Sequence, residues 1–476
     1  MAITAAAVGE VRQATGNDNW GGFFIAGASG TDRSQANAAF VVIDNSTITT
    51  SITTNVITFT GGYTPTAADI GNVVQMLTGT NVTAGFYNIT AQTSTTWTVN
   101  GNVVTSGTTT NATGNMGGAL ATLTKLSGAM LASNKAYGTG NFISTATTTF
   151  AQAVANTSAA APPTRLIGYG STRGDTTHLT VTLSTNTGLT GLKATGNAFF
   201  FEQCDVNGSS LGTSSGITTF TSGFVIRCKV TNCTTAGITL GTSASAVECE
   251  ATGNSGANGA ITGSGNTTGL VTRCFVHDNT SLGINLGSGF ACTYNIVCNN
   301  SGASSDGIFF SSVTSILNNT VHNNGRDGLR GATSQLGMTI RNNLLTSNGG
   351  FGLNLDNAAA LPAAYQYDGN AYYSNTSGAR NNADSTAGIY GVNPYTNTMD
   401  VTLSGSPYVG PTTGTSANFA LNNTAGAGAA CRASGTPGTW PGNTGTTGFL
   451  DMGAVQHADT SGSILVAQGL DGGMNG

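Results

Sequence analysis

Two aspartates, Asp306 and Asp327, are the residues that the sequence best places for chemistry on a sugar. Each directly precedes a glycine of a repeated pattern, so their carboxylates would lie on neighbouring repeats about 5 Å apart. Retaining glycosidases have this separation, and Arg326, Arg330 and His322 lie near the pair in sequence. An aspartate before a glycine is more commonly a turn residue that binds its own backbone. We favour the turn interpretation and name no other catalytic residue.

Two histidines and a cysteine share one position of the same pattern. His277, Cys298 and His322 would stack on three consecutive repeats. Such a column could bind a metal ion, but its spacing is not that of structural zinc sites. We therefore interpret these residues as solvated or turn positions, and we predict no metal and no other cofactor.

Four of the eight cysteines share another position: Cys204, Cys228, Cys249 and Cys274. We interpret them as small apolar side chains that fill a core. Parallel side chains on adjacent strands give poor disulfide geometry, so we predict that these thiols stay reduced.

All these residues belong to a repeat of about 24 residues, within the range of β-solenoid coils. Its reference position, zero, holds Cys204, Cys228, Cys249, Cys274, Asn295, Asn319, Asn343 and Asn370. The position two residues later is apolar in every coil but the last, which has a tyrosine. Because strand side chains alternate, both positions face the core. The sequence thus predicts a column of buried cysteines and a ladder of hydrogen-bonded asparagines.

Other columns support this register. A glycine followed by an apolar residue recurs nine to twelve residues after zero, and we interpret it as a turn that needs positive φ. Position −1 alternates in charge over Arg227, Glu248 and Arg273. Opposite charges would therefore lie above one another on adjacent strands.

The outward position +1 changes character along the repeat. It is charged in the first coils and then becomes Phe275, Ile296, Thr320 and Leu344, beside Tyr294 at position −1. Contiguous outward apolar side chains normally mark an interface. We predict that this face packs between protomers around a threefold axis. The alternative is that a segment of the same chain, between residues 395 and 449, folds back over the column.

The rest of the chain divides around the solenoid. Residues 1–44 are predicted as an attachment segment, and residues 45–115 as a small β domain with short strands and turns. Residues 116–378 are predicted as the solenoid, with a cap helix within 121–137 covering its first coil. Residues 379–476 are an irregular closing region and tail. The predicted fold class is all-β.

Composition excludes several classes of function. Only 7% of the 476 residues are charged, the net charge is −5, and 15 Lys and Arg residues make no basic stripe for nucleic acid. No apolar run approaches the length that spans a bilayer, so we expect no membrane insertion. The N-terminus lacks the basic and apolar regions of a secretory signal peptide.

The coil pattern N-x-h-x-x-N…G-h-x-h, with h apolar, resembles the right-handed parallel β-helix repeat proteins. The segment DMGAVQ at residues 451–456 resembles the D-I-G-A-x-E/Q motif that often ends such helices. The N-terminal MAITAAAVGEVRQATGNDNWGGFF and RLIGYGSTRGD at 165–175 look like segments of phage and environmental viral proteins of this architecture. The resemblance implies a right-handed parallel β-helix in a virion surface protein, commonly a homotrimer. Hydrolases of this family usually show Asp-Asp pairs and a G-H-G signature, which are missing here.

We therefore expect a non-enzymatic structural protein of a phage virion, either a capsid decoration or a tail spike or fibre. It would assemble in the host cytoplasm, bind other virion proteins through its N-terminal region, and contact host surface polysaccharide. Two other classes stay open. One is a polysaccharide-degrading depolymerase of the same fold, and the other is a secreted bacterial adhesin.

Overall fold

The computed structural model describes residues 3–44, 49–106, 108–109, 111–152, 162–184, 188–263, 268–311, 315–331, 339–355, 366–381, 400–411, 416–432, 434–435 and 450–456. The chain divides into two compact units, Met1–Thr234 and Thr235–Gly476. No helix in the described part of the chain is long and apolar enough to cross a membrane.

The first unit contains an eight-stranded antiparallel sheet where a small β domain was predicted. Its strands are β3 (Val41–Ile43), β4 (Thr49–Thr53), β5 (Val56–Gly61), β6 (Val73–Thr78), β7 (Gly85–Gln92), β8 (Thr96–Val99), β9 (Thr108–Thr109) and β10 (Thr113–Met116). Trp97 is fully buried at its centre and packs against the rings of Phe59 and Tyr63. The Trp97 indole N–H donates to Asp69 at 2.9 Å, in the 3-10 helix η1 (Ala67–Asp69).

The first unit also contains coils that contribute to three parallel sheets. One sheet has β1 (Ala7–Arg12), β2 (Phe23–Ile25), β11 (Lys135–Thr139), β14 (Thr164–Gly168), β17 (Phe199–Glu202) and β20 (Phe224–Ile226), in which only the β1–β2 pair is antiparallel. A second has β12 (Asn141–Ser144), β15 (Leu179–Leu183), β18 (Cys204–Asn207) and β21 (Lys229–Thr231). The third has β13 (Thr148–Phe150), β16 (Thr190–Ala194) and β19 (Ser215–Thr218).

The start of this solenoid differs from the prediction. Residues 7–12 were assigned to a separate attachment segment, but β1 pairs in parallel with β11 and is the first strand of the coils. The predicted cap helix is present as α1 (Leu123–Ala129), and the Thr122 hydroxyl caps it by accepting from the Lys125 amide. α1 packs on β1, where the missing side chain of Gly9 leaves room for Leu126.

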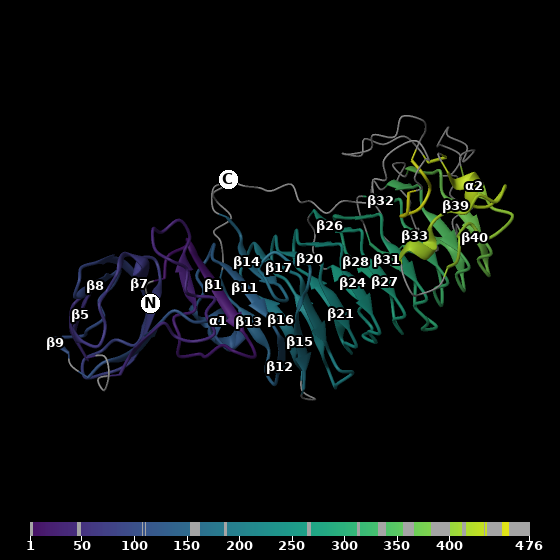
Figure 1. Ribbon diagram of the computed structural model, residues 1–476. Coiled ribbons are helices and arrows are strands. Elements are labelled where there is room, and N and C mark those ends of the chain that lie inside the picture. The colour runs from purple at the N-terminus through teal and green to yellow at the C-terminus, as the bar shows by residue number, and fades with distance from the viewer. Residues whose placement is uncertain are drawn as a thin grey trace. The chain divides into compact units, whose positions relative to one another are not determined.

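The second unit repeats the three-strand coil along its length (Figure 1). Its first sheet has β23 (Ser245–Val247), β26 (Gly269–Thr272), β29 (Phe290–Thr293), β32 (Ser315–Leu317), β35 (Thr339–Arg341) and β38 (Gln366–Asp368). The next has β24 (Glu250–Thr252), β27 (Phe275–His277), β30 (Ile296–Cys298), β33 (Thr320–His322), β36 (Leu344–Thr346), β39 (Ala371–Tyr373) and β41 (Val401–Thr402). The last has β22 (Ala236–Leu240), β25 (Ile261–Gly263), β28 (Ile284–Leu286), β31 (Ile308–Phe310), β34 (Leu329–Gly331), β37 (Phe351–Asn354) and β40 (Gly378–Asn381). The pairs between successive coils are parallel, so the predicted parallel β-helix is confirmed.

Single residues with positive φ turn the chain from one sheet to the next. At position −1 these are Gln203, Arg227, Glu248, Arg273, Tyr294, Asn318 and Asn342, with φ between 51° and 58°. A second corner at position +4 has the same geometry at Asp278, Asn299, Asn323, Ser347 and Ser374. Only asparagine and aspartate among these types visit the left-handed region readily. The stacked coils therefore hold several other side chains in a conformation that they seldom adopt.

The predicted asparagine ladder is confirmed at position zero of the second unit. The side-chain amide of Asn295 donates to Asn319 at 3.0 Å, Asn319 donates to Asn343 at 3.0 Å, and Asn343 donates to Asn370 at 2.9 Å. The same acceptor oxygens also receive backbone amides from the preceding coil. All four side chains are fully buried, so this ladder satisfies polar groups that would otherwise cost free energy.

A second ladder runs at position +5, one residue after the second corner. It joins Asn254, Asn279, Asn300, Asn324, Asn348 and Asn375 through amide–amide hydrogen bonds of 2.7–3.0 Å. Both ladders follow a positive-φ corner directly, because the corner turns the next side chain inward.

The recurring glycines have a different cause from the one predicted. Gly283, Gly307, Gly328 and Gly352 do not have positive φ. A Cβ atom on Gly307 would instead lie 2.3 Å from Cγ1 of Val321 and 2.8 Å from Nδ2 of Asn324. These glycines are needed because the ladder and the apolar column approach the backbone closely.

Gly307→Ala tests this steric explanation. We expect the substitution to lower the free energy of unfolding of the second unit by about 1–3 kcal/mol, as overpacking of a core does. Gly410→Ala is the matched control, because a Cβ atom there meets nothing within 4 Å, and it should change stability by less than about 0.5 kcal/mol. Urea unfolding followed by circular dichroism measures both. Equal effects of the two substitutions would contradict the explanation.

Candidate functional site

The structure places Asp306 and Asp327 inside the coil wall. Asp306 is 0% exposed and Asp327 is 2% exposed. Nε of Arg326 donates to Asp306 at 2.7 Å, a second guanidinium nitrogen forms an ion pair with it, and the Asp327 amide donates to it at 3.2 Å. Asp327 in turn accepts from the Phe351 amide and the Asn354 side chain, both at 2.7 Å.

Each of these carboxylates therefore binds the next coil of the solenoid. Burial raises the pKa of Asp306, while Arg326 and the Asp327 amide act in the opposite direction. Of the other residues predicted near the pair, Arg330 lies on β34 and His322 packs elsewhere. These contacts are those of structural residues, and they leave the carboxylates poorly placed to share one substrate.

His277, Cys298 and His322 form the predicted column, because the register pairs His277 with Cys298 and Cys298 with His322. Contrary to the predicted solvated or turn positions, all three residues lie in strands, where His277 and Cys298 are buried and His322 is half-buried. Nδ1 of His277 lies 2.8 Å from Asp278, Nε2 lies 3.3 Å from Glu250, and its ring stacks on Phe275 at 4.0 Å. Among the residues that the structure describes, no cluster of three or more His, Cys, Asp or Glu side chains could hold a metal ion.

The two histidines of this column differ in their pKa. Burial lowers the pKa of His277, but hydrogen bonds to Glu250 and Asp278 outweigh it and raise the pKa overall. Burial lowers the pKa of His322 to about 4. Its ring lies against Tyr408 and Phe419, and Nδ1 is 2.8 Å from the Thr346 hydroxyl.

All eight cysteines are buried, and none of them forms a disulfide bond. The four predicted in one column occupy equivalent positions after a positive-φ corner, two in each unit. Burial also raises the pKa of other thiols, to about 12 for Cys233 and Cys292. Cys233 and Cys292 are therefore protonated at neutral pH. The four cysteines of the predicted column are buried and fill the core, as predicted.

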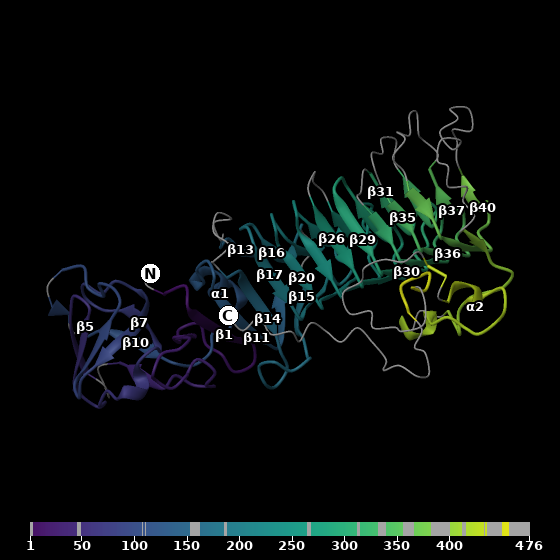
Figure 2. The same cartoon turned by 90° about the horizontal axis from the view of Figure 1, so that it is seen from above.

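The apolar column at position +1 is covered within its own chain. Ile296 is 5% exposed, and Thr320 and Leu344 are 1% and 0% exposed. Ile296 and Leu344 belong to a buried cluster with Leu403, Tyr408, Phe419, Leu421, Cys431 and Met452. Phe275 packs at the edge of this cluster, and Tyr294 is half-buried. Figure 1 shows the C-terminal segment with α2 (Gly428–Cys431) near β33 and β39, and Figure 2 shows it near β36.

For this column the structure shows the fold-back alternative instead of a subunit interface. We call residues 400–411, 416–432 and 450–456 the C-terminal strap. Within the range 395–449 that was considered for the fold-back, residues 395–399, 412–415, 433 and 436–449 lie outside the described residues. β41 of the strap adds a strand to β39, and Asp400 accepts the Asn370 amide at 2.9 Å. The strap thus closes both the sheet and the first asparagine ladder.

The DMGAVQ motif fixes the strap to the coils. The backbone oxygen of Asp451 accepts from Asn318 at 3.1 Å, the Gly453 amide donates to Asn342 at 2.7 Å, and the Ala454 amide donates to Thr320 at 2.9 Å. Gly453 has φ near 100°, and a Cβ atom there would lie 2.8 Å from the Thr320 hydroxyl. Any side chain at position 453 would therefore clash with Thr320 and strain the backbone, so this contact requires glycine.

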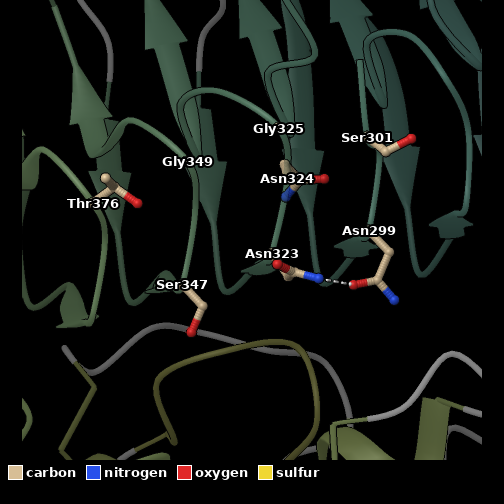
Figure 3. Close-up of a pocket in the computed structure, with 8 residues that line it drawn as sticks. All are labelled: Asn299, Ser301, Asn323, Asn324, Gly325, Ser347, Gly349 and Thr376. Atoms are coloured by element: carbon tan, nitrogen blue, oxygen red, sulfur yellow. Dashed lines mark hydrogen bonds between the residues drawn. The ribbon is translucent and has the colours of Figure 1, made fainter. Parts of the chain in front are cut away.

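A polar hollow of about 380 Å³ lies along the second corner of successive coils (Figure 3). Its lining residues are Asn299, Ser301, Asn323, Asn324, Gly325, Ser347, Gly349 and Thr376. The Asn323 amide donates to Asn299 at 2.7 Å, which links the corners of adjacent coils. None of these eight residues is acidic or aromatic. The hollow offers amides and hydroxyls for hydrogen bonds to sugar hydroxyls and supplies no general acid or base.

The comparisons agree with this geometry. Residues 210–382 match the family model described as the right handed beta helix region. The chain contains a right-handed β-helix. Crystallised pectate lyase Pel9A has a similar fold, with 15% identity, a TM-score of 0.53, and coverage of 71% of this chain and 92% of that chain.

Two further structures resemble the β-helix less closely. A rhamnogalacturonan lyase has 14% identity and a TM-score of 0.42, covering 56% of this chain and 80% of that chain. Dettilon tailspike protein has 15% identity and a TM-score of 0.32, covering 51% and 55%. No curated protein matches the chain in sequence. At these identities the likeness concerns the fold alone.

The hollow was not placed by sequence reasoning, and the strap was named only as the alternative to a subunit interface. Three residues at position +4 line the hollow: Asn299, Asn323 and Ser347. The frequent asparagine at this position could have indicated a positive-φ corner, because asparagine adopts positive φ more readily than most residues. Tyr408 and Phe419 cover the histidine column from more than 80 residues away in sequence, a contact for which the repeat gives no signal.

His322 makes docking of the strap sensitive to pH. Its folded pKa of about 4 lies below the usual 6.5, so the unfolded or undocked form binds more protons between these values. The stability that depends on the neutral ring is therefore complete above pH 6.5 and falls as the pH drops toward 4. We expect a loss of about 2 kcal/mol between pH 7 and pH 5.

Hydrogen–deuterium exchange of peptides from residues 400–432 measures this loss once rates are corrected for pH. His322→Phe keeps an aromatic ring without a titrating group, and it should exchange equally at both pH values. If the exchange rates of His322→Phe and wild type differ by the same factor at both pH values, His322 is not the group that makes strap docking depend on pH.

Proposed function

We propose that the chain is a structural, non-hydrolytic protein on the surface of a phage particle, a capsid decoration or a tail spike or fibre. The observation that carries the proposal is that the best candidate carboxylates, Asp306 and Asp327, are buried and bind successive coils. Side chains that could act on a substrate are used here to hold the solenoid together.

The design of the coils supports a mechanical role. Two buried ladders bind each coil to the next, and the strap covers the outward apolar column. The N-terminal and 165–175 segments resemble phage proteins. In the proposal, the N-terminal region contacts other virion proteins and the coils contact host surface polysaccharide, with the hollow of Figure 3 as a contact for neutral sugars.

A homotrimer is part of the proposal, but its interface is not the column of Phe275, Ile296, Thr320 and Leu344, which the strap covers. A light-scattering mass of the intact chain measures the oligomeric state directly. The proposal places assembly in the host cytoplasm and the mature protein on the released particle.

Immunogold labelling of particles from a culture that carries the gene tests the particle role. We expect gold on the particle surface and co-sedimentation of the chain with particles. Label on bacterial envelopes instead would support the adhesin alternative, and chain found only in the medium would contradict the particle role.

The alternative function is a polysaccharide depolymerase. The hollow favours binding of an extended saccharide along the corners, but its lining supplies no general acid or base for cleavage. We expect purified protein to leave capsular and cell-wall polysaccharides uncut. Asp306→Ala and Asp327→Ala should each cost about 1–2 kcal/mol of local stability and leave assembly intact.

Viscometry and gel filtration of the polysaccharide measure cleavage, and unfolding in urea measures stability. Asp306→Asn is the matched variant, because it keeps the shape of the side chain. Cleavage by wild type that either alanine variant abolishes would establish the depolymerase.

A further inference from the structure

The strands β11, β14, β17 and β20 are successive neighbours in one sheet (Figure 1). They carry a row of outward side chains that the fold does not explain. The register pairs Lys135 with Arg165, Arg165 with Phe200, and Phe200 with Phe224 on successive parallel strands. The residues that follow them, Ala136, Leu166, Phe201 and Val225, are fully buried. Strand alternation therefore directs the four side chains away from the core. We call Lys135, Arg165, Phe200 and Phe224 the cation–aromatic column.

The two cations of this column are direct neighbours, which is unfavourable for like charges on adjacent strands. Elsewhere the coils alternate in charge, as where Arg273 pairs with Glu248 at 3.2 Å. Within the described ranges, neither Lys135 nor Arg165 forms an ion pair with a carboxylate. Two neighbouring positive charges without a counter-charge favour an anionic ligand.

The rings of the column are held in place beside these charges. The Arg165 guanidinium lies 5.1 Å from the centre of the Phe200 ring, and the Phe200 and Phe224 rings are 4.5 Å apart. Nζ of Lys135 lies 5.8 Å from the ring of Tyr137, in the neighbouring outward column. The surface therefore combines aromatic rings with positive charge, and both are fixed on rigid strands.

Arg173 lies at the border of this surface, where it is held rigidly and its positive charge is already neutralised by carboxylates. Arg173 lies 4.7 Å from the Tyr137 ring and forms ion pairs with the buried Glu10 at 2.6 Å and with Asp32 at 3.2 Å. The loop that carries Arg173 is tied by Asp175, whose carboxylate accepts several backbone amides. A ligand would meet a preorganised surface, which lowers the entropic cost of binding.

We propose that the cation–aromatic column binds an anionic polysaccharide built from uronic acids. Lys135 and Arg165 bind its carboxylates, and Phe200 and Phe224 contact the apolar faces of its sugar rings. Single-stranded nucleic acid also stacks on aromatic rings, but its affinity depends on many neutralised phosphates. The column supplies two cations in a chain of net charge −5. The inference deepens the glycan contact of the proposed function and rests on it.

Titration of the full chain with polygalacturonate tests the proposal, with methyl-esterified polygalacturonate as the uncharged probe of the same backbone. We expect binding to polygalacturonate that weakens with added salt, and far weaker binding to the ester. Arg165→Gln should weaken binding about tenfold, since a charge-assisted hydrogen bond contributes on that order. Phe200→Ala should weaken binding without reducing its salt dependence.

Lys193→Gln is the matched control, because Lys193 is an outward cation on β16, in another sheet. It should bind as wild type does, and Arg165→Lys should retain most of the affinity. Circular dichroism and thermal melting verify that each variant is folded.

No binding of polygalacturonate by wild type, equal binding of the ester, or an equal effect of Lys193→Gln would each overturn the proposal. Tighter binding of oligothymidylate than of polygalacturonate would also overturn it, in favour of a nucleic-acid ligand. Particle labelling is a separate measurement, so failure of the particle role and failure of this surface are distinguishable.

Discussion

The second unit depends on one requirement: a buried amide must find its partner on the next coil. Asn319 illustrates it, because its oxygen accepts the backbone and side-chain amides of Asn295 while its own side chain donates to Asn343. This works only if successive coils have the same path at that point. Because the coils must follow the same backbone path, each ladder is preceded by a positive-φ corner in every coil. For the same reason glycines recur where the backbone lies against the ladder.

The same requirement explains what happens to charged residues in the wall. Asp306 and Asp327 lie where one coil meets the next, and each accepts hydrogen bonds from the following coil. A carboxylate without such partners would be costly to bury. At the end of the first ladder, Asp400 takes the acceptor role of the missing next asparagine. The strap therefore completes a pattern of hydrogen bonds as well as covering apolar side chains.

Much of the fold could be predicted because equivalent positions of successive coils hold the same types of residue. The columns of cysteine and asparagine at position zero gave the register, and the register gave the inward and outward faces. The corner at position −1 was not predicted, because Arg227, Glu248 and Tyr294 are not residues that usually adopt positive φ. The glycines were assigned to turns because sequence cannot show that Val321 and Asn324 press against Gly307.

The candidate site was harder to predict, since it depends on contacts between distant segments. The partner of Asp306 was within reach of sequence reasoning, because Arg326 lies one coil away. The partners of His322 were not, because Tyr408 and Phe419 come from the strap. The outward apolar column was recognised from its composition, but composition alone does not distinguish a second copy of the chain from its own C-terminal strap.

The ladders also give the solenoid a direction. Each rung donates its side-chain amide toward the next coil and presents its oxygen to the preceding one, so an interior coil is interchangeable with its neighbours while the two ends are not. A whole coil can in principle be gained or lost without leaving an amide unmatched. A partial coil would break every column at once. The length of such a solenoid can therefore change during evolution only in steps of one coil, each about 4.8 Å. Such a change leaves the structures at both ends unaltered.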